Sequence, residues 1–83
     1  ALPLVADVLD KAALEAAAAQ VLAAYGRVDG LINGAGGNRP EASTLPSERS
    51  FFDLPAEALQ WVFDLNLVGT LLACQVFGAQ MAA

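Results

Sequence analysis

Two short apolar runs punctuate the first part of the chain. Residues 2–6 form the first run, which ends at Asp7, and residues 28–33 form the second, which enters a glycine-rich turn. Apolar runs of this length bounded by turn residues are typical of buried strands. Pro3 is compatible with a strand because it lies near the beginning of the run. The pattern therefore predicts two strands.

The Ala-rich segment between these runs has the periodicity of a helix. Apolar side chains recur at helical spacing over residues 11–25, at Leu14, Ala18, Val21, Leu22 and Tyr25. This spacing places them along one stripe that can face a core. Asp10 is suited to the N-cap, and Gly26 is suited to a left-handed residue that closes the helix. We predict a helix with Tyr25 as a core residue at its end.

Strand, helix and strand within a few tens of residues define a βαβ unit. Its strands should lie parallel in one sheet, joined by a right-handed crossover. Two strands do not make a stable sheet, so partner strands are expected outside these 83 residues. We interpret residues 1–83 as part of one dinucleotide-binding α/β domain with a doubly wound parallel sheet of the Rossmann type. The first residue is not Met, so we expect the chain to begin within a longer protein.

Residues 55–81 predict a long helix. Pro55 suits the first helical position, and Glu57 places a negative charge in the first turn. Apolar residues lie on more than one side, which indicates a helix covered by several neighbours. We expect no membrane-spanning segment, because the apolar run is interrupted by Asp64, Asn66, Gln75 and Gln80.

Residues 37–54 are polar, contain prolines and show no period. Unstructured connections of this length are usually functional or disordered, and we interpret this one as a substrate-side loop. Arg39 and Arg49 are the candidate substrate contacts, since a guanidinium pairs well with a carboxylate. The alternative is that both are solvated surface residues.

Composition narrows the class of partner. Nine acidic residues against four basic ones give a net charge of −5, which argues against nucleic acid. With no His and one Cys, the chain has no recognisable zinc site and no internal disulfide. We expect a cytoplasmic protein.

Ligands of an open parallel sheet bind beyond the carboxyl ends of the strands, where Asp7 and residues 33–36 lie. The sequence Asn-Gly-Ala-Gly at 33–36 resembles the Asn-Asn-Ala-Gly motif of short-chain dehydrogenases/reductases, with Gly34 in place of the second Asn. Other matches follow in the family's order: Asp7-Val8, Tyr-Gly-Arg-Val-Asp at 25–29 and Asn-Leu-Val-Gly-Thr at 66–70. Residues 33–38, 51–54 and 63–66 look most like the D-mannonate oxidoreductase (fructuronate reductase) branch.

This resemblance implies a cofactor site for NAD or NADP. Asp7 would accept a hydrogen bond from the adenine amino group, and the Val8 backbone would fix the ring edge. The alternative for Asp7 is an ordinary turn residue beside a helix. Asn33 would tie neighbouring strands together. The ribose would be approached closely by the backbone of Gly34, Ala35 and Gly36.

Asn66 is the residue to which the resemblance gives a catalytic role. The matching Asn lies at a helix kink, and its backbone carbonyl holds a water that links the catalytic Lys to solvent. Asn is a poor helix former, and Gly69 costs about 1 kcal/mol relative to Ala, so some interaction must offset both. The alternative is a polar residue satisfied by a neighbour.

The family's glycine-rich phosphate turn is not matched, because the third glycine of G-x-G-x-x-G would fall on Arg39. Its Tyr-x-x-x-Lys pair is not matched either, because the only tyrosine, Tyr25, is followed four positions later by Asp29. The resemblance implies an oxidoreductase that moves hydride between NAD(P) and a carbonyl or alcohol, with a sugar acid such as D-mannonate or D-fructuronate favoured. A ketone, steroid or acyl chain is the alternative substrate, and the isolated chain should be inactive. It also implies a homodimer or homotetramer formed through residues 55–81. The rival interpretation is a non-catalytic fragment that only associates through this helix.

Overall fold

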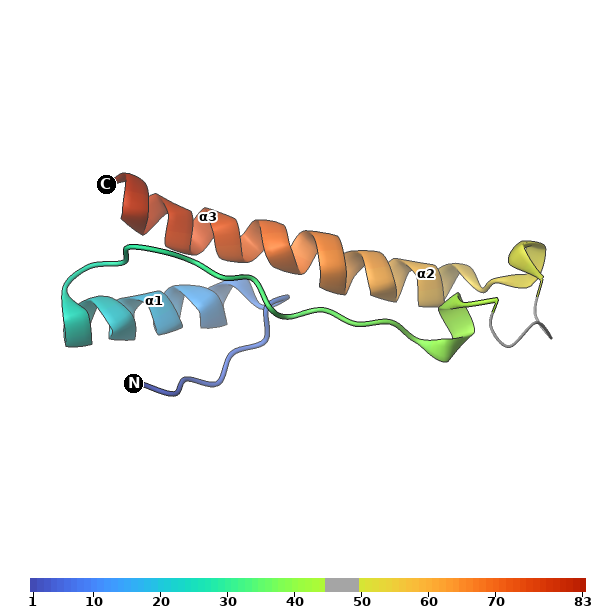
Figure 1. Cartoon of the computed structure of the whole chain (residues 1–83), viewed down its shortest axis with the longest axis horizontal. Helices are drawn as coiled ribbons and strands as arrows, with labels where there is room; N and C mark the ends of the chain where they lie inside the picture. Colours follow the sequence, from blue (N-terminus) through green and yellow to red (C-terminus); the bar gives the residue numbers. More distant parts are fainter. Residues whose placement is uncertain (45–49) are drawn as a thin grey trace.

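The architecture is two packed helical rods with extended chain alongside them. The computed structural model describes residues 1–44 and 50–83. Figure 1 shows an elongated molecule, 52 × 22 × 19 Å. Its elements are, in order, α1 (Lys11–Tyr25), the 3-10 turns η1 (Pro40–Ala42) and η2 (Phe51–Asp53), α2 (Ala56–Phe63), the π-helical turn η3 (Asp64–Val68) and α3 (Gly69–Ala82).

Both ends of α1 are capped as predicted. The Asp10 side chain accepts a hydrogen bond from the Ala13 N–H at 3.1 Å, which satisfies one of the free donors of the first turn. Gly26 adopts a φ of 79°, and its N–H donates to the Leu22 carbonyl at 2.8 Å. Glycine is favoured here because a side chain in the left-handed region costs about 1–2 kcal/mol.

The predicted long helix is present as α2, η3 and α3 without a break, and it ends at Ala82. It begins one residue later than predicted, since Pro55 is the N-cap. By length and mean hydropathy, 1.5, this 27-residue helix could span a membrane. Contrary to our expectation, the polar residues within this helix do not exclude it as a candidate membrane span. Core helices of soluble proteins meet the same criteria, so the absence of a membrane segment stays a prediction.

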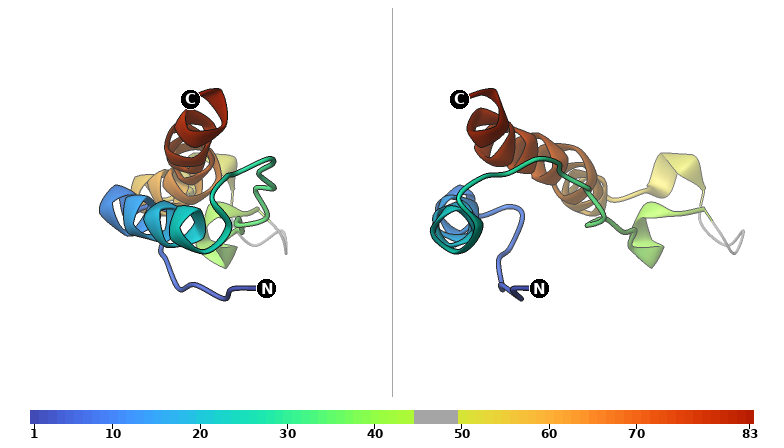
Figure 2. Two further views of the ribbon diagram at one scale, coloured as in Figure 1. Left: turned by 90° about the vertical axis from the view of Figure 1, so that its left-hand side faces the viewer. Right: turned by 60° about the vertical axis from the view of Figure 1, so that its left-hand side comes forward.

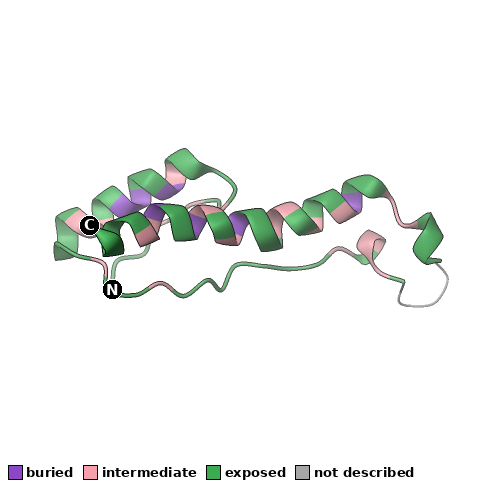
Figure 3. Ribbon diagram, turned by 90° about the horizontal axis from the view of Figure 1, so that it is seen from above, coloured by how far each residue is buried: buried purple, intermediate pink, exposed green. Residues whose placement is uncertain are grey.

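Helices α1 and α3 pack side by side around a small core. Leu14, Ala18 and Val76 are buried between them, with Ala6, Leu72 and Phe77 around this cluster. Figure 3 shows the buried positions on the facing sides of the two helices. The helices diverge toward their C-terminal ends (Figure 1), and Tyr25 remains 58% exposed there. The prediction that Tyr25 is a core residue is wrong, because more than half of its surface is exposed in the described part of the chain.

The predicted strands at 2–6 and 28–33 are extended, but within residues 1–44 and 50–83 no strand is formed. Both run opposite to α1 and α3 (Figure 1), and both lie to one side of the helix pair (Figure 2, left). Val5 and Ile32 are almost fully exposed, at 105% and 95%. Consecutive strands of a doubly wound sheet need not be neighbours, since in the Rossmann order 3-2-1-4-5-6 the third and fourth strands are separated by two others. The parallel sheet therefore stays a prediction.

Candidate functional site

The long helix widens at Asn66. In the π turn η3 the Gly69 N–H donates to the Asp64 carbonyl, five residues back. The side-chain Nδ2 of Asn66 donates to the Val62 carbonyl at 2.8 Å, and the Thr70 hydroxyl donates to the backbone carbonyl of Asn66 at 2.9 Å. Single π turns inside α-helices are frequent at functional sites. The helix irregularity that the family resemblance predicts at Asn66 is therefore present, while its catalytic role stays a prediction.

Asn66 also binds the glycine-rich turn. Its Nδ2 donates to the Gly37 carbonyl at 2.6 Å, and its Oδ1 accepts from the Gly37 N–H at 3.0 Å. A Cβ added to Gly36 would lie 2.7 Å from Asn66 Oδ1, closer than real contacts allow. The turn that follows the second extended segment is thus fixed to the π turn, and Gly36 is required by this close approach.

Asp7 and Val8 occupy the turn that follows the first extended segment. Asp7 Oδ1 accepts from the Leu9 N–H at 2.9 Å, and the Asp7 carbonyl accepts from the Asp10 N–H at 2.9 Å. Asp7 therefore has the turn role named as its alternative. Its side chain is exposed, and a carboxylate has lone pairs for further donors, so an adenine contact is compatible with this geometry.

Val8 packs against the same π turn. A Cβ built on Gly69 would lie 2.8 Å from Val8 Cγ2 and 3.4 Å from Val8 Cβ. The two loops that carry the predicted cofactor residues, after 2–6 and after 28–33, therefore contact one stretch of helix. The sequence did not predict the contacts of Gly37 and Gly69, although Gly69 and Thr70 belong to the motif at residues 66–70.

Asn33, in the second extended segment, contacts α3 nearer its C-terminal end than Gly69. Its Nδ2 is 3.5 Å from Cys74 Sγ, a weak hydrogen bond to sulfur that ties the second extended segment to the helix. Gly34 and Ala35 are exposed, and a Cβ on Gly34 would meet nothing within 4 Å. The space beside Gly34 is therefore open in the described part of the chain.

Arg39 precedes η1 and is held against α2. Its guanidinium carbon is 5.3 Å from the centroid of the Trp61 ring, and its Nε is 3.5 Å from Glu41 Oε2. Arg39 is half-buried, so it is not the freely solvated side chain of the alternative interpretation. Arg49, the other predicted substrate contact, lies outside the described residues.

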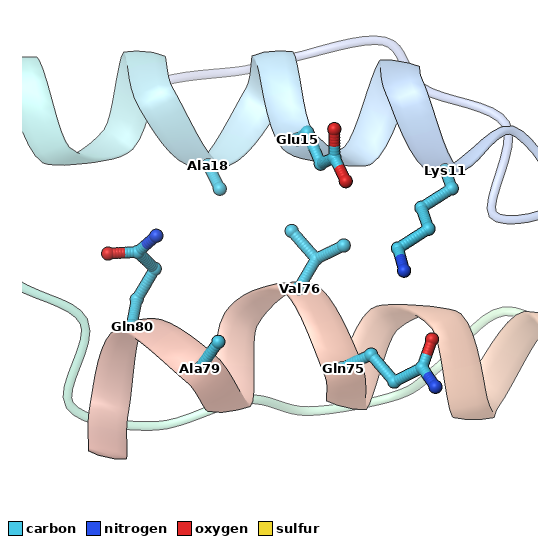
Figure 4. Close-up of a pocket in the computed structure, with 7 residues that line it drawn as sticks. All are labelled: Lys11, Glu15, Ala18, Gln75, Val76, Ala79 and Gln80. Carbon is cyan, nitrogen blue, oxygen red and sulfur yellow. The ribbon is translucent and has the colours of Figure 1, made fainter. Parts of the chain in front are cut away.

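A shallow cavity of about 380 Å³ lies between α1 and α3. Figure 4 shows its polar rim, with Lys11 and Glu15 on α1 facing Gln75 and Gln80 on α3. None of the predicted cofactor or catalytic residues lines it. An apolar depression of about 280 Å³ is lined by Val62, Phe63, Asn66 and Leu67. Across the described parts of the chain, no group of three or more His, Cys, Asp and Glu residues is placed to hold a metal ion.

Known proteins are similar to this chain in sequence and in fold. The sequence model of the short chain dehydrogenase family matches residues 1–83. The uncharacterized oxidoreductase UxuB of Bacillus subtilis is 45% identical over an alignment that covers 92% of this chain and 30% of UxuB. The D-threitol dehydrogenase of Mycolicibacterium smegmatis is 39% identical over 75 residues, 90% of this chain and 26% of that protein.

A crystal structure of a candidate D-mannonate oxidoreductase from Haemophilus influenzae with bound NAD superposes with a TM-score of 0.78. It is 37% identical, over 90% of this chain and 30% of that one. The relatives carry the names of oxidoreductases and dehydrogenases. The chain belongs to the short-chain dehydrogenase family, and the resemblance to the D-mannonate oxidoreductase branch is confirmed. It spans 30% of the length of UxuB and of the solved structure.

Proposed function

We propose that residues 1–83 form part of a longer NAD(P)-dependent oxidoreductase and contribute its adenine-side loop, its ribose-side turn and the helix that carries Asn66. The whole enzyme would transfer hydride between NAD(P) and a carbonyl or alcohol. The observation that carries this proposal is the convergence of both loops on one π turn. Gly37 is bonded to Asn66, and Val8 is seated on Gly69.

The residues present fit a nicotinamide dinucleotide. Asp7 presents an exposed acceptor for an adenine amino group, and the open backbone at Gly34 leaves room for a ribose. The bound cofactor would supply the hydride. Asn66 would keep its carbonyl at the π turn, where the Thr70 hydroxyl donates to it at 2.9 Å. The cofactor residues of this proposal are Asp7, Val8, Asn33, Gly34, Ala35 and Gly36.

A sugar acid such as D-mannonate or D-fructuronate is the proposed substrate. Supporting it are the similarity to a candidate D-mannonate oxidoreductase and the position of Arg39 beside Trp61. A guanidinium can bind a sugar carboxylate through two parallel hydrogen bonds. The similarity to a D-threitol dehydrogenase favours a neutral polyol as the second candidate.

The test uses the full-length natural protein that contains residues 1–83. NADH or NADPH formation is followed with D-mannonate and with D-threitol, and cofactor oxidation is followed with D-fructuronate. Turnover of mannonate and fructuronate with NAD or NADP is the expected result. Turnover of threitol alone would reject the sugar-acid proposal and leave the oxidoreductase standing. No turnover of any kind, without cofactor binding, would reject both.

The competing function is association without catalysis through the long helix. Phe63, Leu67 and Leu71 stand four residues apart and are 62%, 51% and 52% exposed, so the long helix presents an apolar face that another molecule would have to cover. We propose that a second copy covers part of this face in a cytoplasmic homodimer or homotetramer.

The intact mass of the purified protein separates a longer enzyme from a fragment that only associates. A mass of 8.5 kDa would mean that the catalytic residues are missing, whereas about 25–30 kDa fits one doubly wound domain of roughly 250 residues.

A further inference from the structure

Val8 packs against Gly69, the glycine that directly follows the π turn. Gly69 is buried, and its N–H closes the π turn by bonding to the Asp64 carbonyl. An added methyl group would lie 2.8 Å from Val8 Cγ2 and 3.7 Å from the Asp64 carbonyl oxygen. Among the described residues, Val8 therefore fills the space that a side chain at Gly69 would need.

The close contact is with Val8 Cγ2, because Val8 Cβ, 3.4 Å from the added carbon, is at an ordinary van der Waals distance. Val8 is β-branched and stiff at χ1, so turning Cγ2 away requires a less favoured rotamer. Gly69 lies in the middle of a continuous helix that cannot move independently. The added methyl group is then accommodated by a less favoured Val8 rotamer or by an outward shift of the turn that carries residues 7–8.

We infer that Gly69 is a positioning residue for the adenine half of the cofactor, acting through Val8. The inference rests on the proposed function, in which the Val8 backbone holds the edge of the adenine ring. A larger residue at 69 would displace the 7–8 turn in the free protein. Cofactor binding would then have to restore the original position of that turn, at a cost in binding free energy. Affinity for the adenine half should fall, while the reacting end of the cofactor is unaffected.

Gly78 provides a matched control. It lies on the same helix, and a Cβ there would meet nothing within 4 Å. Gly→Ala within a helix gains about 1 kcal/mol of helix propensity at either position, so a difference between the two variants isolates the contact with Val8.

The experiment measures the Kd of NAD and of ADP-ribose, which carries the adenine half without nicotinamide, on the full-length protein by calorimetry. For Gly69→Ala both Kd values should rise about tenfold, or about 1.4 kcal/mol, which is the scale on which an inserted methyl is felt. KM for NAD should follow, with kcat within about twofold. Gly78→Ala should match the wild type. Adding Val8→Ala to Gly69→Ala should restore most of the affinity, because the clashing Cγ2 is gone.

Equal affinities of Gly69→Ala and Gly78→Ala would overturn the inference. A fall in kcat with unchanged Kd would also overturn it, because Gly69 would then act on the reacting end. Thermal unfolding of each variant identifies loss of folding, and in that case Gly69→Ser is compared with Gly78→Ser in the same way. Absence of NAD binding by the wild type would instead reject the proposed function.

Discussion

The side chain of Asn66 pairs with both backbone groups of Gly37, donating to its carbonyl at 2.6 Å and accepting from its N–H at 3.0 Å. This two-bond pairing resembles the exchange between neighbouring strands, but here a helix side chain supplies the partner. Because Nδ2 also donates to the Val62 carbonyl, the same amide fixes the turn and the widened helix together.

Asn66→Asp tests this pairing with almost no change in shape. The Oδ1 acceptor is kept, but a carboxylate oxygen would replace the Nδ2 donor opposite two carbonyls. We predict a loss of about 1–3 kcal/mol in the free energy of unfolding, measured by denaturant titration of the full-length protein. Asn38→Asp brings the same charge change to an exposed residue of the loop and should stay within about 0.5 kcal/mol of the wild type. Equal stability of the two variants would contradict a structural role for the Asn66 amide.

Gly36→Ala tests the close approach of the turn to the helix. Its methyl group would lie 2.7 Å from Asn66 Oδ1, so Asn66 would have to give up its bonds to Gly37. We predict a destabilisation of about 1–3 kcal/mol in thermal or denaturant unfolding.

Gly34→Ala is the control for Gly36→Ala, since its methyl group would meet nothing within 4 Å and neither glycine has a positive φ. Combining Gly36→Ala with Asn66→Ala should cost less than the sum of the single changes, because they disturb the same contact. Strict additivity would mean that the clash lies elsewhere.

Arg39→Ala tests the proposed sugar-acid site. If the guanidinium binds a carboxylate, KM for D-mannonate should rise about tenfold or more, which corresponds to the loss of about 1.5–3 kcal/mol of charge-assisted bonding. KM for NAD should not change. Arg27→Ala removes another arginine, which pairs with Asp29 on the exposed surface, and should leave both constants unchanged. An unchanged KM for mannonate in Arg39→Ala would show that Arg39 only packs on Trp61.

Leu71→Glu tests whether a second copy covers the helix face. A charge buried between helices without a partner is strongly unfavourable, so the full-length protein should shift to a smaller assembly in light scattering. Ala19→Glu, on the exposed side of α1, should leave the mass unchanged. An unchanged assembly in Leu71→Glu would place the interface elsewhere.

Local features could be predicted from the sequence because local chemistry determines them. Asp10 and Gly26 have the side chain and the backbone freedom that the ends of α1 require. The irregularity at Asn66 was expected from the resemblance of residues 66–70 to the family motif, and the weak helix propensity of Asn and Gly is consistent with it. The expected position of the cofactor site rests on a rule about parallel sheets, and it stays a prediction.

Long-range features could not be predicted in this way. The seat of Val8 on Gly69 and the pairing of Asn66 with Gly37 join residues far apart in the chain, and no periodicity encodes them. Tyr25 fits an apolar stripe, yet it remains exposed where α1 and α3 diverge. The strand-like segments lack ladder partners within the described residues, so pattern alone did not reveal how they would pair.

The most direct test of the central claim is a calorimetric titration of the full-length natural protein with NAD and, separately, with NADP. The account predicts saturable binding of one of the two at one site per chain, weakened by Asn66→Asp and unaffected by Asn38→Asp. No binding of either cofactor by the folded wild-type protein would contradict the claim that residues 1–83 contribute a nicotinamide dinucleotide site.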